Sequence, residues 1–310
     1  MNVHCPLCNH ESFTVVYKEL PQCPDAAIVQ CGNCGHLYTL LRKEINMDNL
    51  YADEVYKVVE NRDSVYDKIL NREYRGVIDN LNALSRQKGS LLDFGSGKGK
   101  FGSLVKENGW QVKCVETSPE RAAYSRSVYG LEVYTGFYNS GNIFHTYFDA
   151  LTLFHVLEHL PHPKPLLEEL IKNNLKEDAL VVIEVPNINS WQSRIAGNRW
   201  IHLDVPRHIN HFTPRRLEEF LRELGLRPVK RSFFSFHLGV LGMVDSLLKL
   251  FGYQKNIIYE LKNKKSRTLL VKIALLLPFA IIAERIASVL GKGGITRMYL
   301  SRRPAFIASL

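Results

Sequence analysis

Three glycines and two carboxylates form the first group of residues with recognisable chemistry. The segment 91–101 reads Leu-Leu-Asp-Phe-Gly-Ser-Gly-Lys-Gly-Lys-Phe, so an apolar strand ends at Asp93 and a glycine-rich turn follows. A second expected strand, 111–116, ends in Glu116. Glycines let the backbone approach a ligand closely, and an acid after the second strand accepts hydrogen bonds from ribose hydroxyls. The pattern predicts a nucleoside-binding edge of an α/β sheet.

The glycine spacing indicates which nucleoside this edge binds. A dinucleotide fold places a third glycine where Lys100 stands, and Asp93 before the turn suits a cationic ligand better than a pyrophosphate. The segments 91–101, 115–119 and 148–151 resemble the class I S-adenosylmethionine-dependent methyltransferases. The resemblance implies S-adenosylmethionine as the cofactor. A Rossmann-like sheet with another ligand, or with none, is the alternative.

Strands and helices alternate along the chain, which predicts a doubly wound, mostly parallel sheet of the Rossmann-like methyltransferase type. Strands are expected over 90–93, 111–116, 131–135, 148–153, 179–185 and 227–236, with a last antiparallel strand over 295–302. Ligands bind where parallel strands end. The expected cofactor contacts are Asp93, Gly95, Ser96, Gly97, Gly99, Glu116, Thr117, Gly136, Phe137 and Phe154. Gly136 and Phe137 are candidates to flank the adenine, and a core position is the alternative for Phe137.

Histidines follow two of these strands. After 148–153 comes a turn with His155, Glu158 and His159, whose i, i+3 and i+4 spacing puts them on one helical face. The later segment 200–212 adds His208 and His211. These five residues are the candidate catalytic group. Either His159 or His208 acts as a base on a hydroxyl acceptor, or a metal lowers the pKa of that hydroxyl.

The histidine pattern is similar to that of the small-RNA 2′-O-methyltransferases and the ubiquinone-pathway O-methyltransferases. This resemblance implies a second divalent metal at Glu158, His159 and His211. His155 stands where those families have a carboxylate, which disfavours Mg²⁺ and leaves Zn²⁺, Mn²⁺, Fe²⁺ or no metal. In the simpler interpretation, Glu158 and His159 bond to each other and cap the next helix, while His208 anchors its loop together with His211.

Two C-x2-C pairs near the start predict a metal module. Four thiolates from two such turns fit one tetrahedral Zn²⁺ with a structural role, because they leave no open coordination position. The stretch between the pairs alternates well enough for short strands over 13–17 and 26–30, as in a zinc ribbon. So short a segment has little core of its own, so zinc would supply much of its folding energy. The expected ligands are Cys5, Cys8, Cys31 and Cys34.

Charge is unevenly distributed along the 310 residues, whose net charge is +9. Residues 226–310 hold fifteen Lys/Arg and three Asp/Glu, so the remainder is slightly acidic. Two apolar stretches, 238–251 and 268–290, are joined by a basic link that includes Lys262, Lys264, Lys265 and Arg267. They are too short and too interrupted for a transmembrane helix. Peripheral attachment to an anionic membrane is expected, with a lid or dimer interface as the alternative.

The predicted organisation is a zinc-ribbon-like module over 1–45, a helical connector over 46–88 and a methyltransferase domain over 89–310. Within that domain, 237–293 is a basic, apolar helical insertion before the last strand. No targeting signal is recognised, so a cytoplasmic protein, peripheral at the inner face of the membrane, is expected.

Several features together look like bacterial methyltransferases associated with cell-surface glycan pathways: the cysteine pairs followed by Leu50 and Tyr51, the turn 156–160 and the segment 200–212. The resemblance implies methyl transfer to a small-molecule, sugar or lipid-linked glycan acceptor. An RNA methyltransferase that docks through the zinc ribbon is less favoured, because the basic charge lies with the apolar insertion. A non-enzymatic cofactor-binding adaptor is the remaining alternative.

Overall fold

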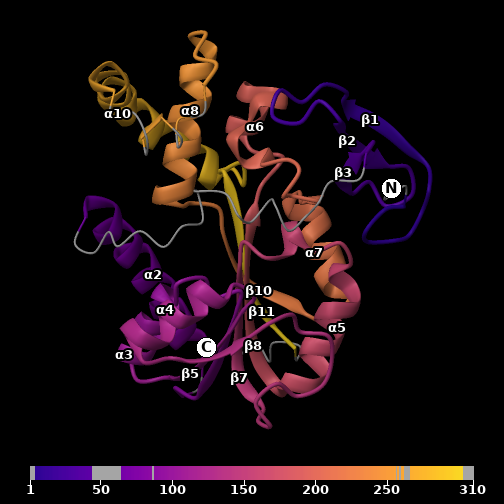
Figure 1. The fold of residues 1–310 in the computed structure, drawn as a ribbon, viewed down its shortest axis with the longest axis vertical. Coiled ribbons are helices and arrows are strands. Elements are labelled where there is room, and N and C mark those ends of the chain that lie inside the picture. Colours follow the sequence, from indigo (N-terminus) through magenta and orange to yellow (C-terminus); the bar gives the residue numbers. More distant parts are fainter. Residues whose placement is uncertain are drawn as a thin grey trace, which may run out of the picture. The chain divides into compact units, whose positions relative to one another are not determined.

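The computed structural model describes residues 4–43, 64–85, 87–255, 257, 260–261 and 266–302 (Figure 1). The chain forms two compact units. The first comprises Met1–Lys57, Pro186–Arg216 and Ser232–Thr296, and the second comprises Val58–Val185, Leu217–Arg231 and Arg297–Leu310. Residues 46–63 of the expected connector, with Leu50 and Tyr51, lie outside the described residues, as do Lys262, Lys264 and Lys265 of the basic link.

A seven-stranded sheet forms the centre of the second unit. Its strand order is β10-β11-β8-β7-β4-β5-β6, and the pairs from β8 to β6 are parallel. This order confirms the predicted doubly wound α/β sheet. The strands are β4 (Ser90–Phe94), β5 (Gln111–Glu116), β6 (Glu132–Thr135), β7 (Phe148–Phe154), β8 (Leu175–Pro186), β10 (Arg227–Ser232) and β11 (Ile295–Ser301).

Helices cover both faces of this sheet (Figure 1). On one face lie α2 (Val65–Leu84), α3 (Lys100–Glu107) and α4 (Pro119–Tyr129), and on the other lie α5 (Pro163–Asn174) and α7 (Pro214–Glu223). The cap of α4 follows the sequence signals, because Ser118 accepts a hydrogen bond from the Arg121 amide and Gly130 ends the helix in the left-handed region. Apolar residues of α2 and α3, such as Leu81 and Phe101, pack with those of β4, β7 and β8 in one buried cluster.

One expected strand is too long. Residues 227–236 were expected to be extended throughout, but β10 ends at Ser232. Phe234 and Phe236 instead pack against the core of the first unit, whose centre is Trp200. Burial of two aromatic rings outweighs continuation of an edge strand, so the chain leaves the sheet there.

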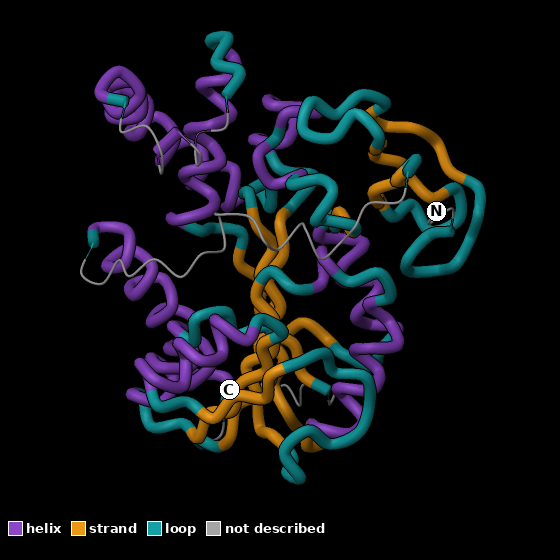
Figure 2. The backbone as a smooth tube through the Cα atoms, viewed as in Figure 1, coloured by secondary structure: helices purple, strands orange, loops and turns teal. Residues whose placement is uncertain are grey.

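The first unit contains a small antiparallel sheet that carries the cysteine pairs. Its order is β1 (Phe13–Tyr17), β2 (Ala26–Cys31), β3 (Leu37–Leu41) and β9 (Asn210–His211). Figure 2 shows the segment 4–43 as strands and loops without a helix. The strands expected over 13–17 and 26–30 are therefore present, and a two-residue strand from the later histidine segment completes the sheet.

The described helices of the first unit are α6 (Trp191–Ala196), α8 (Leu241–Leu250) and α10 (Arg267–Val289). A single π-helical turn (Phe236–Val240) precedes α8. Short 3-10 turns lie at Gly197–Arg199 and Ile201–Leu203. The two apolar stretches of the expected insertion are thus helical, and Met243 of α8 and Ala280 of α10 share one core. Among the described residues, no helix has both the length and the apolar character needed to cross a membrane.

Candidate functional site

The glycine turn after β4 has the backbone shape that the sequence predicts. Gly95, Gly97 and Gly99 all have positive φ, at 76°, 57° and 77°. Only glycine adopts this region at little cost. At Gly95 a side chain would also collide with Val156, because an added Cβ would lie 2.5 Å from its Cγ2. The amides of Gly95 and Ser96 both donate to the carbonyl of Val115, at 2.9 and 3.0 Å, which fixes the turn beside β5.

Asp93, at the carboxyl end of β4, is a buried acid with one oxygen still to be satisfied. Its Oδ1 accepts a hydrogen bond from Thr152 Oγ1 at 2.7 Å, whereas its Oδ2 has no hydrogen-bond partner among the described residues. Burial raises the pKa of Asp93 to about 7, although the Thr152 hydrogen bond lowers it. A buried carboxylate without a cation is costly, so this side chain is prepared to bind a positively charged ligand.

Glu116, at the end of β5, lies across the glycine turn. Its Oε2 accepts from the amide of Gly97 at 2.7 Å, and its Oε1 accepts from the amide of Ser118 at 2.8 Å and from Thr117 Oγ1 at 3.5 Å. Each carboxylate oxygen has two lone pairs, so Oε2, which accepts one hydrogen bond, can still accept from a hydroxyl. The two strand ends therefore present two carboxylates above a loop of bare backbone.

The aromatic candidates lie in different environments. Phe137, which follows β6 and Gly136, is 78 % exposed, so it does not occupy the core position that was its alternative. Phe154, at the end of β7, is half-buried and lies edge-on to Phe101, with ring centroids 4.7 Å apart. Phe137 is thus available to a ligand, whereas much of Phe154 packs against the α3 side of the sheet.

His155 is fixed by hydrogen bonds on both sides of its ring. Its Nδ1 lies 3.1 Å from Glu158 Oε1 and its Nε2 lies 2.9 Å from Glu184 Oε1. Burial lowers the pKa of His155, but the hydrogen bonds and charges of Glu158 and Glu184 raise it to about 10. A doubly protonated imidazolium is therefore the stable form at neutral pH. It has no lone pair for a metal, and it cannot take up another proton.

The charges around His155 continue into the interior. Glu184 Oε2 pairs with Arg297 Nε of β11, and Arg297 Nη2 lies 3.1 Å from Glu73 Oε1 of α2. Glu184 and Arg297 are both buried. The chain Glu158–His155–Glu184–Arg297–Glu73 alternates in charge and joins the turn after β7 to two strands and a helix. We call these five residues the buried charge chain.

The remaining histidine-group candidates divide between the units. Glu158 and His159 belong to the second unit, and His208 and His211 belong to the first. Glu158 is 1 % exposed and bonds to His155, while the next helix, α5, begins with Pro163 and has no side-chain cap. The joint role of these residues at a second metal stays a prediction.

In the first unit, His208 and His211 connect their loop to the cysteine module. Thr39 Oγ1 of β3 donates to the carbonyl of His208 at 2.6 Å and lies 2.9 Å from His211 Nε2. The Thr39 proton is already used, so His211 Nε2 carries a hydrogen and donates it to Thr39. Burial holds the pKa of His211 well below its usual value, so this ring is neutral.

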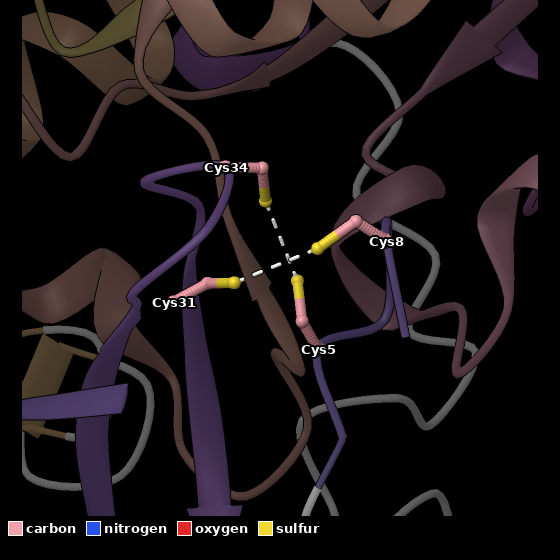
Figure 3. A group of neighbouring side chains, drawn as sticks. All are labelled: Cys5, Cys8, Cys31 and Cys34. Atoms are coloured by element: carbon pink, nitrogen blue, oxygen red, sulfur yellow. Dashed lines mark hydrogen bonds between the residues drawn. The ribbon is translucent and has the colours of Figure 1, made fainter. Parts of the chain in front are cut away.

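The four cysteines converge on one point (Figure 3). Their Sγ atoms all lie within 4.8 Å of one another, with Cys5 to Cys34 at 3.6 Å and Cys8 to Cys31 at 3.5 Å. Four sulfurs about 2.3 Å from a tetrahedral zinc would be separated by about 3.8 Å, which is close to these spacings. The hydrogen bond from Cys5 lowers the pKa of Cys34 to about 5, which favours a thiolate. These residues can hold a metal ion.

The two cysteine turns have matching backbones. The Asn9 amide donates to the carbonyl of Cys5 at 2.9 Å, and the Gly35 amide donates to the carbonyl of Cys31 at 3.1 Å. Asn9 and Gly35, each directly after the second cysteine of its pair, have φ of 57° and 68°. Each C-x2-C pair is therefore folded back so that both of its thiols point the same way.

Sequence reasoning missed three members of the buried charge chain, Glu73, Glu184 and Arg297. Glu184 had a usable signal, because it is the single charge in the apolar strand segment 179–185. Arg297 interrupts an apolar strand in the same way. A lone charge in a buried strand must be paired, but the sequence alone does not name its partner.

A methyltransferase domain family matches residues 66–231, which is more than half of the chain. The protein belongs to this family, and its domain is that of a class I S-adenosylmethionine-dependent methyltransferase. No curated protein compared with the sequence matches it.

Solved structures of similar fold include other methyltransferases at low sequence identity. An S-adenosylmethionine-dependent methyltransferase from Archaeoglobus fulgidus is 22 % identical, with coverage of 76 % of this chain and 96 % of that one and a TM-score of 0.47. A possible histamine N-methyltransferase from Thermotoga maritima is 18 % identical, with 62 % and 87 % coverage and a TM-score of 0.47. A putative sarcosine dimethylglycine methyltransferase from Galdieria sulphuraria is 16 % identical, with 81 % and 91 % coverage and the same TM-score.

Arg297→Met tests the buried charge chain. The substitution removes the buried guanidinium that links Glu184 to Glu73, so we expect a loss of about 3–5 kcal/mol of unfolding free energy, measured by urea denaturation. Arg231→Met is the matched control, because Arg231 pairs with Glu218 at 2.7 Å but is 41 % exposed. The control should lose no more than about 1 kcal/mol. Equal losses in the two variants would contradict the importance assigned to this chain.

The raised pKa of Asp93 predicts how cofactor affinity depends on pH. We expect the ammonium group of S-adenosylhomocysteine to bind the ionised carboxylate, whose fraction grows as pH rises through about 7. Calorimetry should therefore show affinity increasing about five- to eightfold from pH 6.0 to 7.5, while the amino group of the ligand stays mostly protonated. Asp93→Asn should bind weakly and without this pH dependence. The control is Asp149→Asn, which removes an acid from the start of β7, whereas Asp93 lies near the end of β4. This variant should keep the pH dependence. If the affinity of Asp93→Asn rose with pH as steeply as that of the original protein, Asp93 would be excluded as the source of the pH dependence.

Proposed function

We propose that this methyltransferase transfers a methyl group to a small-molecule, sugar or lipid-linked acceptor, in a cell-surface glycan or related pathway. The single observation that carries the catalytic part is the pair of carboxylates, Asp93 and Glu116, above a loop of three left-handed glycines. Among the described residues, helices α8 and α10 of the first unit expose basic and apolar side chains but no acid, which supports a negatively charged or lipid-linked acceptor.

The residues present fit the cofactor by their own chemistry. Asp93 offers an unsatisfied buried oxygen to an ammonium group, and Glu116 Oε2 offers a remaining lone pair to a ribose hydroxyl. Exposed Phe137 can lie against the adenine. When bound, S-adenosylmethionine supplies the activated methyl group. The protein must then align the acceptor with that methyl, which accounts for much of the rate.

We assign the base to His159 rather than to its neighbour. Both ring nitrogens of His155 are held by glutamates, so that ring serves as a fixed cation beside the site. His159 lies in the same turn, Leu157–His159, which follows the carboxyl end of β7. A histidine side chain is a suitable general base for removing the proton of a hydroxyl acceptor. His155 holds Glu158 and the turn in place while His159 acts.

His159→Ala tests this assignment. We expect transfer of labelled methyl from S-adenosylmethionine to membrane-extract acceptors to fall by about 100-fold or more, which is the usual contribution of a general base. Affinity for S-adenosylhomocysteine should stay within about twofold, since the carboxylates remain. The control is His162→Ala, an exposed histidine three residues away. Undiminished turnover of His159→Ala would refute the assignment, and transfer to total RNA instead of the extract would refute the acceptor class.

We further propose that the four cysteines hold one structural Zn²⁺. The spacing of the four sulfurs and the paired backbone turns support this, and no ligand position remains open for catalysis. Strand β3 of the cysteine-bearing sheet pairs with β9, and Thr39 of β3 hydrogen-bonds to His211. A metal in this sheet would therefore also stabilise the histidine-containing loop 200–212.

Metal content distinguishes the zinc site from an ordinary thiol cluster. Purified protein should contain one zinc per chain by plasma mass spectrometry, and Cys34→Ser should lose most of it. Cys23→Ser is the matched control, because Cys23 is half-buried and lies outside the four-sulfur group. Zinc removal by a chelator should also lower the melting temperature, since binding energy at such a site is folding energy. Full zinc content in Cys34→Ser would argue against the site.

A further inference from the structure

The outer face of α10 is a continuous apolar stripe. Six large side chains along it are between 49 % and 88 % exposed: Val271, Leu275, Phe279, Ile282, Ile286 and Val289. Their spacing of three or four residues places them on one side of the helix, over about 27 Å of its length. The opposite side of α10 packs into the core of the first unit through residues such as Leu269 and Ala280. The helix is therefore apolar on two faces, and the described part of the chain covers only one of them.

Exposed apolar side chains also extend to the neighbouring helix. Leu250 and Phe251, at the end of α8, are 61 % and 77 % exposed. Helices α8 and α10 share a core, and Figure 1 shows them side by side. A set of exposed large apolar residues of this size marks a surface that meets a partner or a membrane.

The charged residues near α8 and α10 indicate which kind of surface binds the apolar stripe. All three acidic residues between 233 and 294 are turned inward: Asp245, Glu260 and Glu284 are buried. Asp245 pairs with Lys249, Glu260 lies 3.8 Å from Lys255, and Glu284 accepts from Gln192 and from the Gly294 amide. The exposed charged side chains of α10 are consequently all basic: Arg267, Lys272 and Arg285.

We propose that the outer face of α10 lies on an anionic lipid surface, with its apolar stripe inserted at the headgroup boundary and its cations toward the lipid phosphates. A helix with apolar and basic exposed residues and no exposed acid has the composition of an interfacial anchor. A second copy of the chain suits this face less well, because two such faces would bring like charges together. This inference goes beyond the methyl-transfer function and does not depend on it.

The test is cosedimentation of the full chain with vesicles of phosphatidylcholine containing 30 % phosphatidylglycerol, and with phosphatidylcholine alone. We expect binding to the anionic vesicles at low salt, binding at least several-fold weaker to the neutral ones, and a similar loss at about 0.5 M salt. Light scattering should show a monomer at the same concentration. A stable dimer that buries the stripe, or no vesicle binding at low salt, would overturn the proposal.

Matched variants separate the two contributions. Leu275→Gln combined with Phe279→Gln should weaken binding at least about tenfold, because two large apolar side chains no longer enter the lipid. Val15→Gln combined with Val16→Gln changes exposed apolar residues of the cysteine module and should bind normally. Lys272→Gln should weaken binding about fivefold, whereas Lys18→Gln, another exposed lysine of the first unit, should not.

Folding of these variants is checked independently of lipid. Each variant should retain the melting temperature of the original protein and its affinity for S-adenosylhomocysteine, since the carboxylates at the ends of β4 and β5 are unchanged. Normal vesicle binding by the Leu275 and Phe279 double variant would overturn the proposal. Loss of methyl transfer with normal vesicle binding would bear on the enzymatic proposal alone.

Discussion

The structure of the second unit depends on buried side chains of opposite charge that are paired with one another. Arg297 lies between Glu184 and Glu73, and Glu184 in turn holds His155. These contacts join β7, β8, β11 and α2 at the edge where the cofactor loop lies. A buried ion pair adds little stability compared with an apolar pair, but removal of one member is costly because a charge is left unpaired. The chain of charges therefore specifies one arrangement of these elements. Other arrangements would leave a buried charge unpaired, which is costly.

This arrangement is the basis of the different roles proposed for His155 and His159. The His155 ring lies between two glutamates, so it remains protonated through the neutral range and its position is fixed. Its amide also donates to the carbonyl of Glu184, which holds the turn after β7 against β8. The positive φ of 56° at His155 is maintained by these three hydrogen bonds, because a non-glycine residue in that region needs such compensation. The His155 cation thus holds the turn in place, and His159 lies at the end of the same turn.

Local chemistry made much of the site predictable from the sequence. The glycine turn, the acids after β4 and β5, and the two cysteine pairs each depend on residues close together in the chain, so their spacing carries the information. The buried charge chain was not predictable, because Glu73 and Arg297 are 224 residues apart. Similarly, nothing in the pattern of 200–212 indicates that Asn210 and His211 pair with β3, since a strand of two residues has no periodicity. The early end of β10 depends on where Phe234 and Phe236 find a core, which is a tertiary choice.

The orientation of α10 also reflects a choice between competing costs. Burial of Glu284 is expensive, and burial raises its pKa to about 7 although Gln192 and the Gly294 amide donate hydrogen bonds to it. Rotation of the helix by about one residue's turn, roughly 100°, would bring this acid toward solvent and move part of the stripe into the core. In water alone, hydration of the acid would favour the rotation, whereas the apolar area gained by burying the stripe would be offset by the apolar face that leaves the core. The observed register keeps the acid buried and the stripe exposed. The proposed apolar and negatively charged surface favours this register, because it accepts the stripe and would repel an outward carboxylate.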